Sequence, residues 1–195
     1  MFDPEQITDY DRTVPELQEF LVFAIMVAGK RADLTVKKME LLKEEMRVKR
    51  SWFTRFKSKK QVNAALEATK VGQYNRIGAA FAALGKKVVD LRYCSAEDLE
   101  EIPGIGPKTA RFFLLHSRPN ERCAVLDTHI LKSLRERGYD APLSTPSGSS
   151  YKKWEAVWLS HVPEGQEAEK DLATWTAKRM KSGKPLLPKG GRDAR

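Results

Sequence analysis

Residues 102–110 have the sequence IPGIGPKTA, and this stretch decides which structures the neighbouring chain can form. Pro103 ends any preceding helix because proline cannot continue one, and Gly104 and Gly106 tolerate backbone angles that are closed to other residues. Pro107 suits the first turn of a new helix. The stretch therefore predicts a tight turn between two helices.

The sequence on both sides of this turn favours helices. Upstream, Ser95 precedes a run of acidic residues, which is the pattern of a helix N-terminus. Downstream, helical spacing turns Arg111 outward. The same spacing predicts an inward face made of Ala110, Phe113 and Leu114. We therefore expect a helix, a glycine hairpin and a second helix at about residues 95–116.

The hairpin has the features of a phosphate-binding turn. Its glycines carry no side chain, so a phosphate can approach the free amides of the second helix and meet the positive end of the helix dipole. This predicts contacts to a DNA backbone from Gly104, Ile105, Gly106 and Thr109. The structural alternative is a plain turn between two helices.

Lys108 places an amine at the start of the second helix. The helix dipole disfavours an ammonium there, and this repulsion, together with partial burial, favours the neutral amine that a nucleophile needs. The alternative is a solvated lysine that reaches a phosphate. The position therefore predicts either a nucleophile or a backbone contact.

Asp127 follows Lys108 by nineteen positions and comes directly after the apolar segment 124–126. Its carboxylate can stabilise a positive charge in a water-poor pocket. An aspartate before a helical sequence is also an ordinary N-cap, and both interpretations stay open. His129, two residues further on, is a candidate phosphate contact or a polar residue at the helix start.

Together, the hairpin, Lys108 and Asp127 resemble the helix-hairpin-helix DNA glycosylases of the endonuclease III and 8-oxoguanine glycosylase superfamily. The resemblance implies that Lys108 attacks the sugar C1′ of a damaged nucleotide and that Asp127 supports deprotonation and the cationic sugar. A lysine at this position implies AP lyase activity in addition to base removal. The implied partner is double-stranded DNA with a damaged or modified base.

The resemblance extends upstream to residues 16–33. This segment is similar to the helix and loop from which such enzymes push a side chain into the emptied base stack, which places Lys30 and Arg31 at the DNA. Lys30 stands about where many relatives carry glutamine or asparagine, so the residue that fills the stack stays open.

The C-terminal part from residue 151 onward resembles the compact archaeal-type 8-oxoguanine DNA glycosylases, which favours 8-oxoguanine as the substrate. The resemblance places Asp171 and Trp175 near the flipped base, with Trp175 as a stacking platform. The alternative is that the tryptophans of this region are core residues: Trp154, Trp158 and Trp175.

Metals and cofactors are constrained by the few cysteines. The chain has two cysteines, Cys94 and Cys123, which are too few for a four-cysteine iron-sulfur cluster. We therefore expect no cluster and no other cofactor, and we expect both thiols to be free and buried. No side-chain set predicts a metal site. The resemblance implies a potassium or sodium ion held by the hairpin carbonyls of Glu100, Ile102 and Ile105.

The composition favours a nucleic-acid partner. Thirty-five lysines and arginines against 26 aspartates and glutamates give a net charge of +9 in 195 residues. Positions 1–30 hold six acids and two bases, so the positive charge is concentrated in the remainder of the chain. Such a balance suits a phosphodiester polymer, although basicity alone would also suit an RNA-binding protein.

Helical spacing predominates, which predicts an all-α protein with two helical lobes and the two-lobed fold of the glycosylases. One lobe is expected to combine residues 1–30 with 150–182, and the central lobe, 31–138, carries the hairpin. Residues 141–150 are rich in helix-breaking residues and are expected to link the lobes, while 183–195 form a basic, disordered tail. The active site is expected in the cleft between the lobes.

The sequence also suggests where the protein acts. Its longest uncharged run, residues 20–29, is about half of a bilayer span. With no signal peptide recognised, we expect a monomer in the reducing cytoplasm or nucleoid, without a membrane partner. Two other hypotheses remain: a non-catalytic helix-hairpin-helix DNA-binding module, and an enzyme of the same fold that installs or processes a hypermodified base in viral DNA.

Overall fold

The computed structural model describes residue 3 and residues 6–181, with the side chains of 175–181 left out. In this part of the chain there are nine α-helices, one short 3-10 helix and no strand, which confirms the predicted all-α class. The elements are α1 (Val14–Val27), α2 (Ala32–Glu45), η1 (Phe53–Arg55), α3 (Lys59–Ala68), α4 (Tyr74–Leu84), α5 (Ala96–Glu100), α6 (Pro107–Ser117), α7 (Thr128–Glu136), α8 (Gly148–Leu159) and α9 (Glu167–Lys181). The predicted tail, 183–195, lies outside the described residues.

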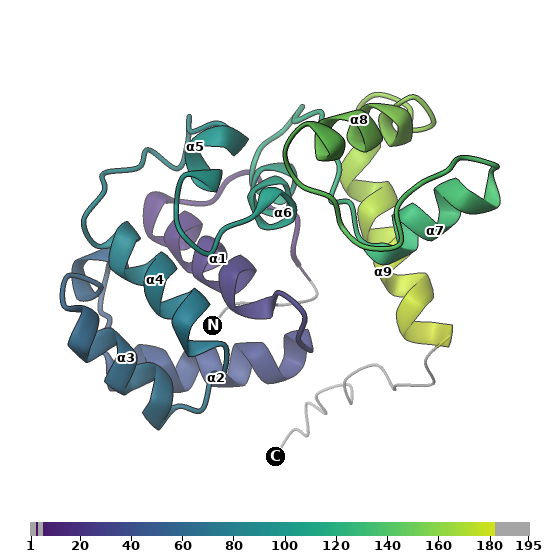
Figure 1. The fold of residues 1–195 in the computed structure, drawn as a ribbon. Coiled ribbons are helices and arrows are strands. Elements are labelled where there is room, and N and C mark those ends of the chain that lie inside the picture. The colour runs from purple at the N-terminus through teal and green to yellow at the C-terminus, as the bar shows by residue number, and fades with distance from the viewer. Residues whose placement is uncertain (1–2, 4–5, 182–195) are drawn as a thin grey trace, which may run out of the picture.

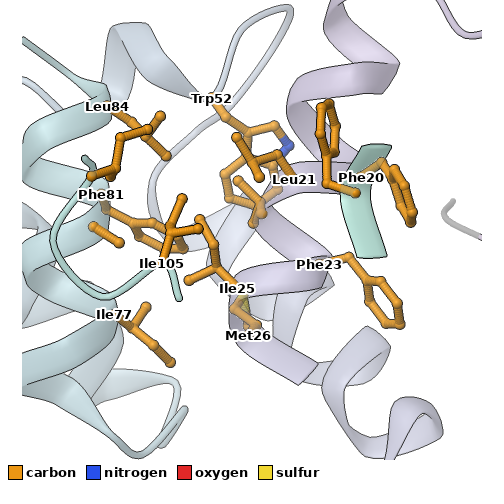
Figure 2. Close-up of a cluster of buried hydrophobic side chains, with 14 of the residues drawn as sticks. Phe20, Leu21, Phe23, Ile25, Met26, Trp52, Ile77, Phe81, Leu84 and Ile105 are labelled. Atoms are coloured by element: carbon orange, nitrogen blue, oxygen red, sulfur yellow. The ribbon is translucent and has the colours of Figure 1, made fainter. Parts of the chain in front are cut away.

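Helix α1 is the central element of the larger lobe. All residues from 20 to 26 are buried, and a helix that is apolar on every side must be surrounded by other helices. It packs against α2, α4 and α6. Figure 2 shows its side chains meeting Trp52, Phe81 and Ile105 from the elements around it.

The buried residues divide into two clusters. The larger one is built from α1 to α6, and it includes the stacked rings of Phe56 and Phe81, whose centroids lie 4.2 Å apart. The smaller one joins α7 and α8 to the segment before α7: Ala124, Leu126, Ile130, Leu131, Leu134, Ala141, Tyr151 and Trp154. Figure 1 shows α7, α8 and α9 on one side and α2, α3 and α4 on the other, with α1 and α6 between them.

The two clusters bear on the predicted division into lobes. Residues 1–30 were predicted to form a lobe with 150–182; α1 shares the larger cluster with α2–α6, and Ala168 and Leu172 of α9 pack against that same cluster. Residues 141–150 do not link the lobes; they connect α7 to α8 within the smaller cluster, where Ala141 is buried. Trp154 is a core residue, as the structural alternative predicted.

The predicted helices around the glycine hairpin are observed. Ser95 caps α5 by accepting a hydrogen bond from the Asp98 backbone N–H at 3.1 Å, and Pro107 is the first residue of α6. Gly104 has a φ of +87°, and a Cβ at this position would lie 2.5 Å from the backbone oxygen of Arg76. Only glycine therefore fits this turn, because the hairpin lies directly against α4.

Arg111 is buried, which corrects the prediction that it turns outward. Its side chain is 5% exposed, and its Nε donates to Glu155 Oε1 at 2.8 Å. Nη1 pairs with Glu100, and the guanidinium lies over the ring of Tyr151. Helical spacing could not reveal that α8 covers this face and supplies the carboxylate that a buried cation requires.

Candidate functional site

A cavity of about 440 Å³ opens between α1, α6 and α9. Its walls come from the C-terminal end of α1 and the loop after it, the first half of α6, the segment before α7, and α9. Six of the residues predicted for the site line it: Lys30, Arg31, Lys108, Thr109, Asp127 and Asp171. The cavity thus brings an exposed amine and two carboxylates to one place between the two clusters.

Lys108 is the second residue of α6, at the mouth of the cavity. Its side chain is exposed, so the expected partial burial is wrong. Gly106, the N-cap, provides no side-chain hydrogen bond, and a Cβ added there would meet no atom within 4 Å. The start of α6 is therefore uncapped by a side chain and open to a ligand.

Asp127 is the N-cap of α7, as one of the two interpretations predicted. Its Oδ1 accepts hydrogen bonds from the backbone N–H groups of His129 at 2.8 Å and Ile130 at 2.9 Å. Both bonds fall on one oxygen, and no described residue donates to Oδ2. Capping fixes the carboxylate and leaves one oxygen available at the cavity.

Helix α8 holds the segment that leads to Asp127. The Tyr151 hydroxyl donates to the Ala124 carbonyl at 2.7 Å and accepts from the Leu126 N–H at 2.9 Å. Glu155 Oε1 accepts from the Ala124 N–H at 3.0 Å and also from Arg111 of α6. Burial raises the pKa of the Tyr151 hydroxyl, so it keeps its proton for this bond. The helix of Lys108 and the segment of Asp127 are therefore joined through α8.

Lys30 lies in the loop after α1 and turns toward the loop between α3 and α4. Its Nζ donates to the Val71 carbonyl at 2.9 Å. Partial burial, together with the charges of Arg76 and Lys38, lowers the pKa of Lys30 to about 8. Arg31 pairs with Asp33 at the start of α2, with Nε and Oδ1 3.0 Å apart.

The other predicted residues lie away from the cavity lining. Gly104 lies against α4, Ile105 is buried, and His129 is half-buried at the start of α7, so their DNA contacts stay predictions. The Ile102 carbonyl, one of three expected to hold a potassium or sodium ion, accepts the Ile105 N–H at 3.0 Å within the hairpin. The side chain of Trp175 lies outside the described residues.

The described part of the chain shows neither a side-chain metal site nor a membrane-spanning helix. That part of the chain holds no cluster of three or more His, Cys, Asp or Glu side chains arranged for a metal ion. None of its helices combines the length and the apolar character that crossing a bilayer requires. Cys94 and Cys123 are free and buried, as expected, and burial raises the pKa of both thiols.

Two residues of this region were missed by the sequence analysis. Arg76 joins the hairpin to α1, because its Nη1 donates to the Gly104 carbonyl at 3.0 Å and its Nη2 to the Ile25 carbonyl at 2.7 Å. His116 is fully buried beneath the cavity and contacts Asp171. A histidine within an apolar helix gives no local signal of such a partner 55 positions away.

The fold and the cavity define an all-helical, two-lobed protein whose shared site presents an amine and two carboxylates. This fold is also that of the crystal structure of Methanocaldococcus jannaschii 8-oxoguanine glycosylase/lyase in complex with a 15mer DNA containing 8-oxoguanine. The TM-score is 0.66 at 19% identity, over 93% of this chain and 88% of that one. The M. jannaschii 8-oxoguanine DNA glycosylase (MjOgg) gives 0.65 at 20% identity, over 93% and 86%.

These likenesses confirm the two-lobed helical fold that the resemblance predicted. No protein family model matches the sequence, and no curated protein matches it.

Proposed function

We propose that the protein is a DNA glycosylase with AP lyase activity, acting on a damaged or modified base flipped out of duplex DNA, with 8-oxoguanine favoured. One observation carries the proposal: Lys108 and Asp127, from different helices, line one cavity. The solved structures of the same fold support it, because one is a glycosylase/lyase in complex with DNA containing 8-oxoguanine.

In the proposed reaction, the neutral amine of Lys108 attacks C1′ of the flipped nucleotide, and the base leaves with the electrons of the glycosidic bond. Positive charge develops on the sugar ring during this step. Asp127 is held by its cap bonds, so the carboxylate can stabilise that charge without first reorganising. Lys108 is exposed in the free protein, but bound DNA would cover its side chain and exclude water from the amine.

Strand cleavage follows from the covalent intermediate. After the sugar ring opens, the lysine and C1′ form a Schiff base, which withdraws electrons from C2′. Loss of a proton from C2′ then expels the 3′ phosphate and leaves a nick. Water finally hydrolyses the imine and restores Lys108. The proposed steps use only the lysine amine, the aspartate carboxylate and water.

The DNA is proposed to be held on both sides of the cavity mouth. On one side, the open turn at Gly106 and the first turn of α6, including Thr109, offer amides to a phosphate. On the other side, Lys30 and Arg31 offer positive charge. Because such contacts release counterions from the DNA, affinity is expected to fall steeply with salt.

Borohydride trapping tests the proposal. Incubation with a duplex that contains 8-oxoguanine or an abasic site is expected to give a reduced covalent adduct, and Lys108→Gln is expected to abolish it. Lys132→Gln is the matched control, because Lys132 is exposed on α7 and, among the described residues, pairs only with the exposed Glu136, at 3.7 Å. An adduct of unchanged yield in Lys108→Gln would remove the lysine from the mechanism.

Product analysis on a panel of single-lesion duplexes tests the substrate. A free base with a nicked strand is the expected product, and preference for 8-oxoguanine over uracil or oxidised pyrimidines supports the favoured base. An altered base that stays attached would support the processing of a modified base instead. Binding without any product would identify a DNA-binding module.

A further inference from the structure

His116 is the most deeply buried ionisable side chain beneath the cavity. It lies near the end of α6, one helical turn after Phe112, and its side chain has no solvent exposure. A buried imidazole needs partners for both ring nitrogens. Nδ1 lies 2.8 Å from the Thr8 hydroxyl, and Nε2 lies 3.1 Å from Asp171 Oδ2.

The partners decide which ring nitrogen carries the proton. A carboxylate can only accept hydrogen bonds, so Nε2 of a neutral His116 donates to Asp171. Nδ1 is then the acceptor, and the Thr8 hydroxyl donates to it. Thr8, His116 and Asp171 thus form one directed chain of hydrogen bonds from the N-terminal segment through α6 to α9.

The N-terminal end of this chain is anchored to α6. The His116 backbone carbonyl accepts from Arg12 Nη1 at 2.8 Å and from the Asp9 N–H at 3.1 Å. Arg12 is itself buried, and its Nη2 donates to the Ile7 carbonyl at 2.7 Å. These bonds hold the segment that carries Thr8 in place, so the imidazole has a fixed partner on its far side.

The other end of the chain reaches the cavity. Asp171 lines the cavity, and its side chain is only 15% exposed. Oδ2 is occupied by His116, while no described residue donates to Oδ1. The ring of Phe112, which also lines the cavity, meets the His116 ring edge-on with centroids 5.0 Å apart. His116 therefore supports two of the residues that a bound base would touch.

We infer that His116 is a positioning residue that holds Asp171 as a hydrogen-bond acceptor for an N–H group of the extruded base. The inference rests on the proposed function and deepens it. A base that presents an N–H donor toward α9 gains a hydrogen bond to Oδ1, whereas a base that presents an acceptor there is repelled by the carboxylate. An abasic nucleotide has no base, so its cleavage does not depend on this chain.

The test compares two activities of the same full-length variant under single-turnover conditions. His116→Phe removes both ring hydrogen bonds and is expected to slow base release from a lesion duplex by about ten- to a hundredfold. Cleavage of an abasic duplex is expected to stay within about twofold of the wild-type rate. His116→Gln retains an N–H donor near the position of Nε2 and is expected to restore most of the lost base release.

Two further variants keep the test decisive if His116→Phe fails to fold. Thr8→Val removes only the hydroxyl and is expected to slow base release by about two- to fivefold, again without slowing abasic cleavage. Asp171→Asn is expected to lower base release, and adding Thr8→Val to it is expected to cost little more, because both changes act through one carboxylate.

Equal loss of both activities in His116→Gln and Thr8→Val would show a merely structural role and overturn the inference. Unchanged base release in His116→Phe and Thr8→Val would overturn it as well. Failure of the proposed function has a different signature, since wild-type protein would then release no base and form no borohydride adduct.

Discussion

The starts of α6 and α7 carry the two central residues of the site, and they are built in opposite ways. Helix α6 begins after Gly106, without a side-chain cap, and its Lys108 is exposed. Helix α7 begins at Asp127, whose carboxylate accepts two backbone hydrogen bonds of its own helix. One helix start is left open, and the other is closed by the residue that faces the cavity.

The difference shows how one local structure can serve two purposes. An open helix start attracts an anion and leaves room for a phosphate beside Lys108. A capped helix start gives its carboxylate a fixed orientation, which electrostatic stabilisation requires. In Asp127 the cap and the proposed charge are therefore the same group, and the structural interpretation does not compete with the functional one.

The largest effect on turnover is expected for Asp127→Asn, which removes the negative charge of residue 127 and keeps its capping hydrogen bonds. Asparagine caps helices about as well as aspartate, so Asp127→Asn should leave the free energy of unfolding nearly unchanged. Turnover should fall by roughly 10²- to 10³-fold, because the charge is lost. Single-turnover kinetics and thermal unfolding measure the two quantities.

Asp127→Ala serves as the comparison, since it removes the charge and the cap together. It should lower turnover similarly and destabilise the protein by about 0.5–2 kcal/mol more than asparagine does. Full turnover in Asp127→Asn would reduce this residue to a cap.

Loosening the segment before α7 is expected to have the next largest effect. Tyr151→Phe leaves the Ala124 carbonyl and the Leu126 N–H without their shared partner, which should lower the free energy of unfolding by about 2 kcal/mol. Denaturant unfolding measures this loss. Tyr139→Phe is the control, because its hydroxyl pairs with His161 at the surface and its removal should cost less than about 0.5 kcal/mol. Equal costs in both variants would contradict the role given to Tyr151.

The two glycines of the hairpin should respond differently to alanine. Gly104→Ala should destabilise the protein by about 1–2 kcal/mol, because its positive φ and its contact with Arg76 exclude a side chain. Gly106→Ala should leave stability within about 0.5 kcal/mol and weaken binding to duplex DNA instead. Thermal unfolding and fluorescence anisotropy separate the two effects. Unchanged DNA affinity in a stable Gly106→Ala variant would remove the open turn from the interface.

The smallest effect is expected at Lys30, on the opposite side of the cavity mouth. Because its pKa is lowered to about 8, its ammonium is present below that pH and lost above it. Affinity for undamaged duplex should fall by about two- to fivefold between pH 7 and pH 9 at constant salt. Lys30→Arg keeps its charge over this range and should remove the decline.

The lowered pKa of Lys30 also makes the stability of the folded protein depend on pH. The folded pKa of Lys30 lies below its ordinary value of 10.5, so the unfolded chain binds the proton more tightly. This residue's contribution to stability should therefore increase as the pH rises from about 8 to 10.5.

A wild-type affinity for duplex DNA without pH dependence between pH 7 and pH 9 would show that Lys30 does not contact DNA through its charge.

Much of the site was predicted from sequence because its parts are local. The turn follows from Pro103 and two glycines, the start of α6 from Pro107, and the cap of α7 from Asp127. Each of these preferences acts within a few residues. The exposure of Lys108 was predicted wrongly, because exposure depends on which other helices approach the cavity mouth.

The burial of charged and polar side chains could not be predicted in the same way. Arg111 looked like an outward residue of an amphipathic helix, and its partner Glu155 lies 44 positions further along the chain. His116 had no recognisable role until α9 brought Asp171 beside it. Likewise, the segment of α1 was predicted to pair with 150–182, and its buried residues 20–26 place it in the larger cluster with α2–α6.

The sequence by itself determined the helices, the hairpin and the two helix starts that carry Lys108 and Asp127, because backbone preferences and capping act between neighbours. Only the tertiary structure decided that these two residues share a cavity with Asp171, and that His116 and Arg111 are buried beside carboxylates. A buried ionisable side chain is stable only where a partner meets it, and here each partner comes from a distant segment.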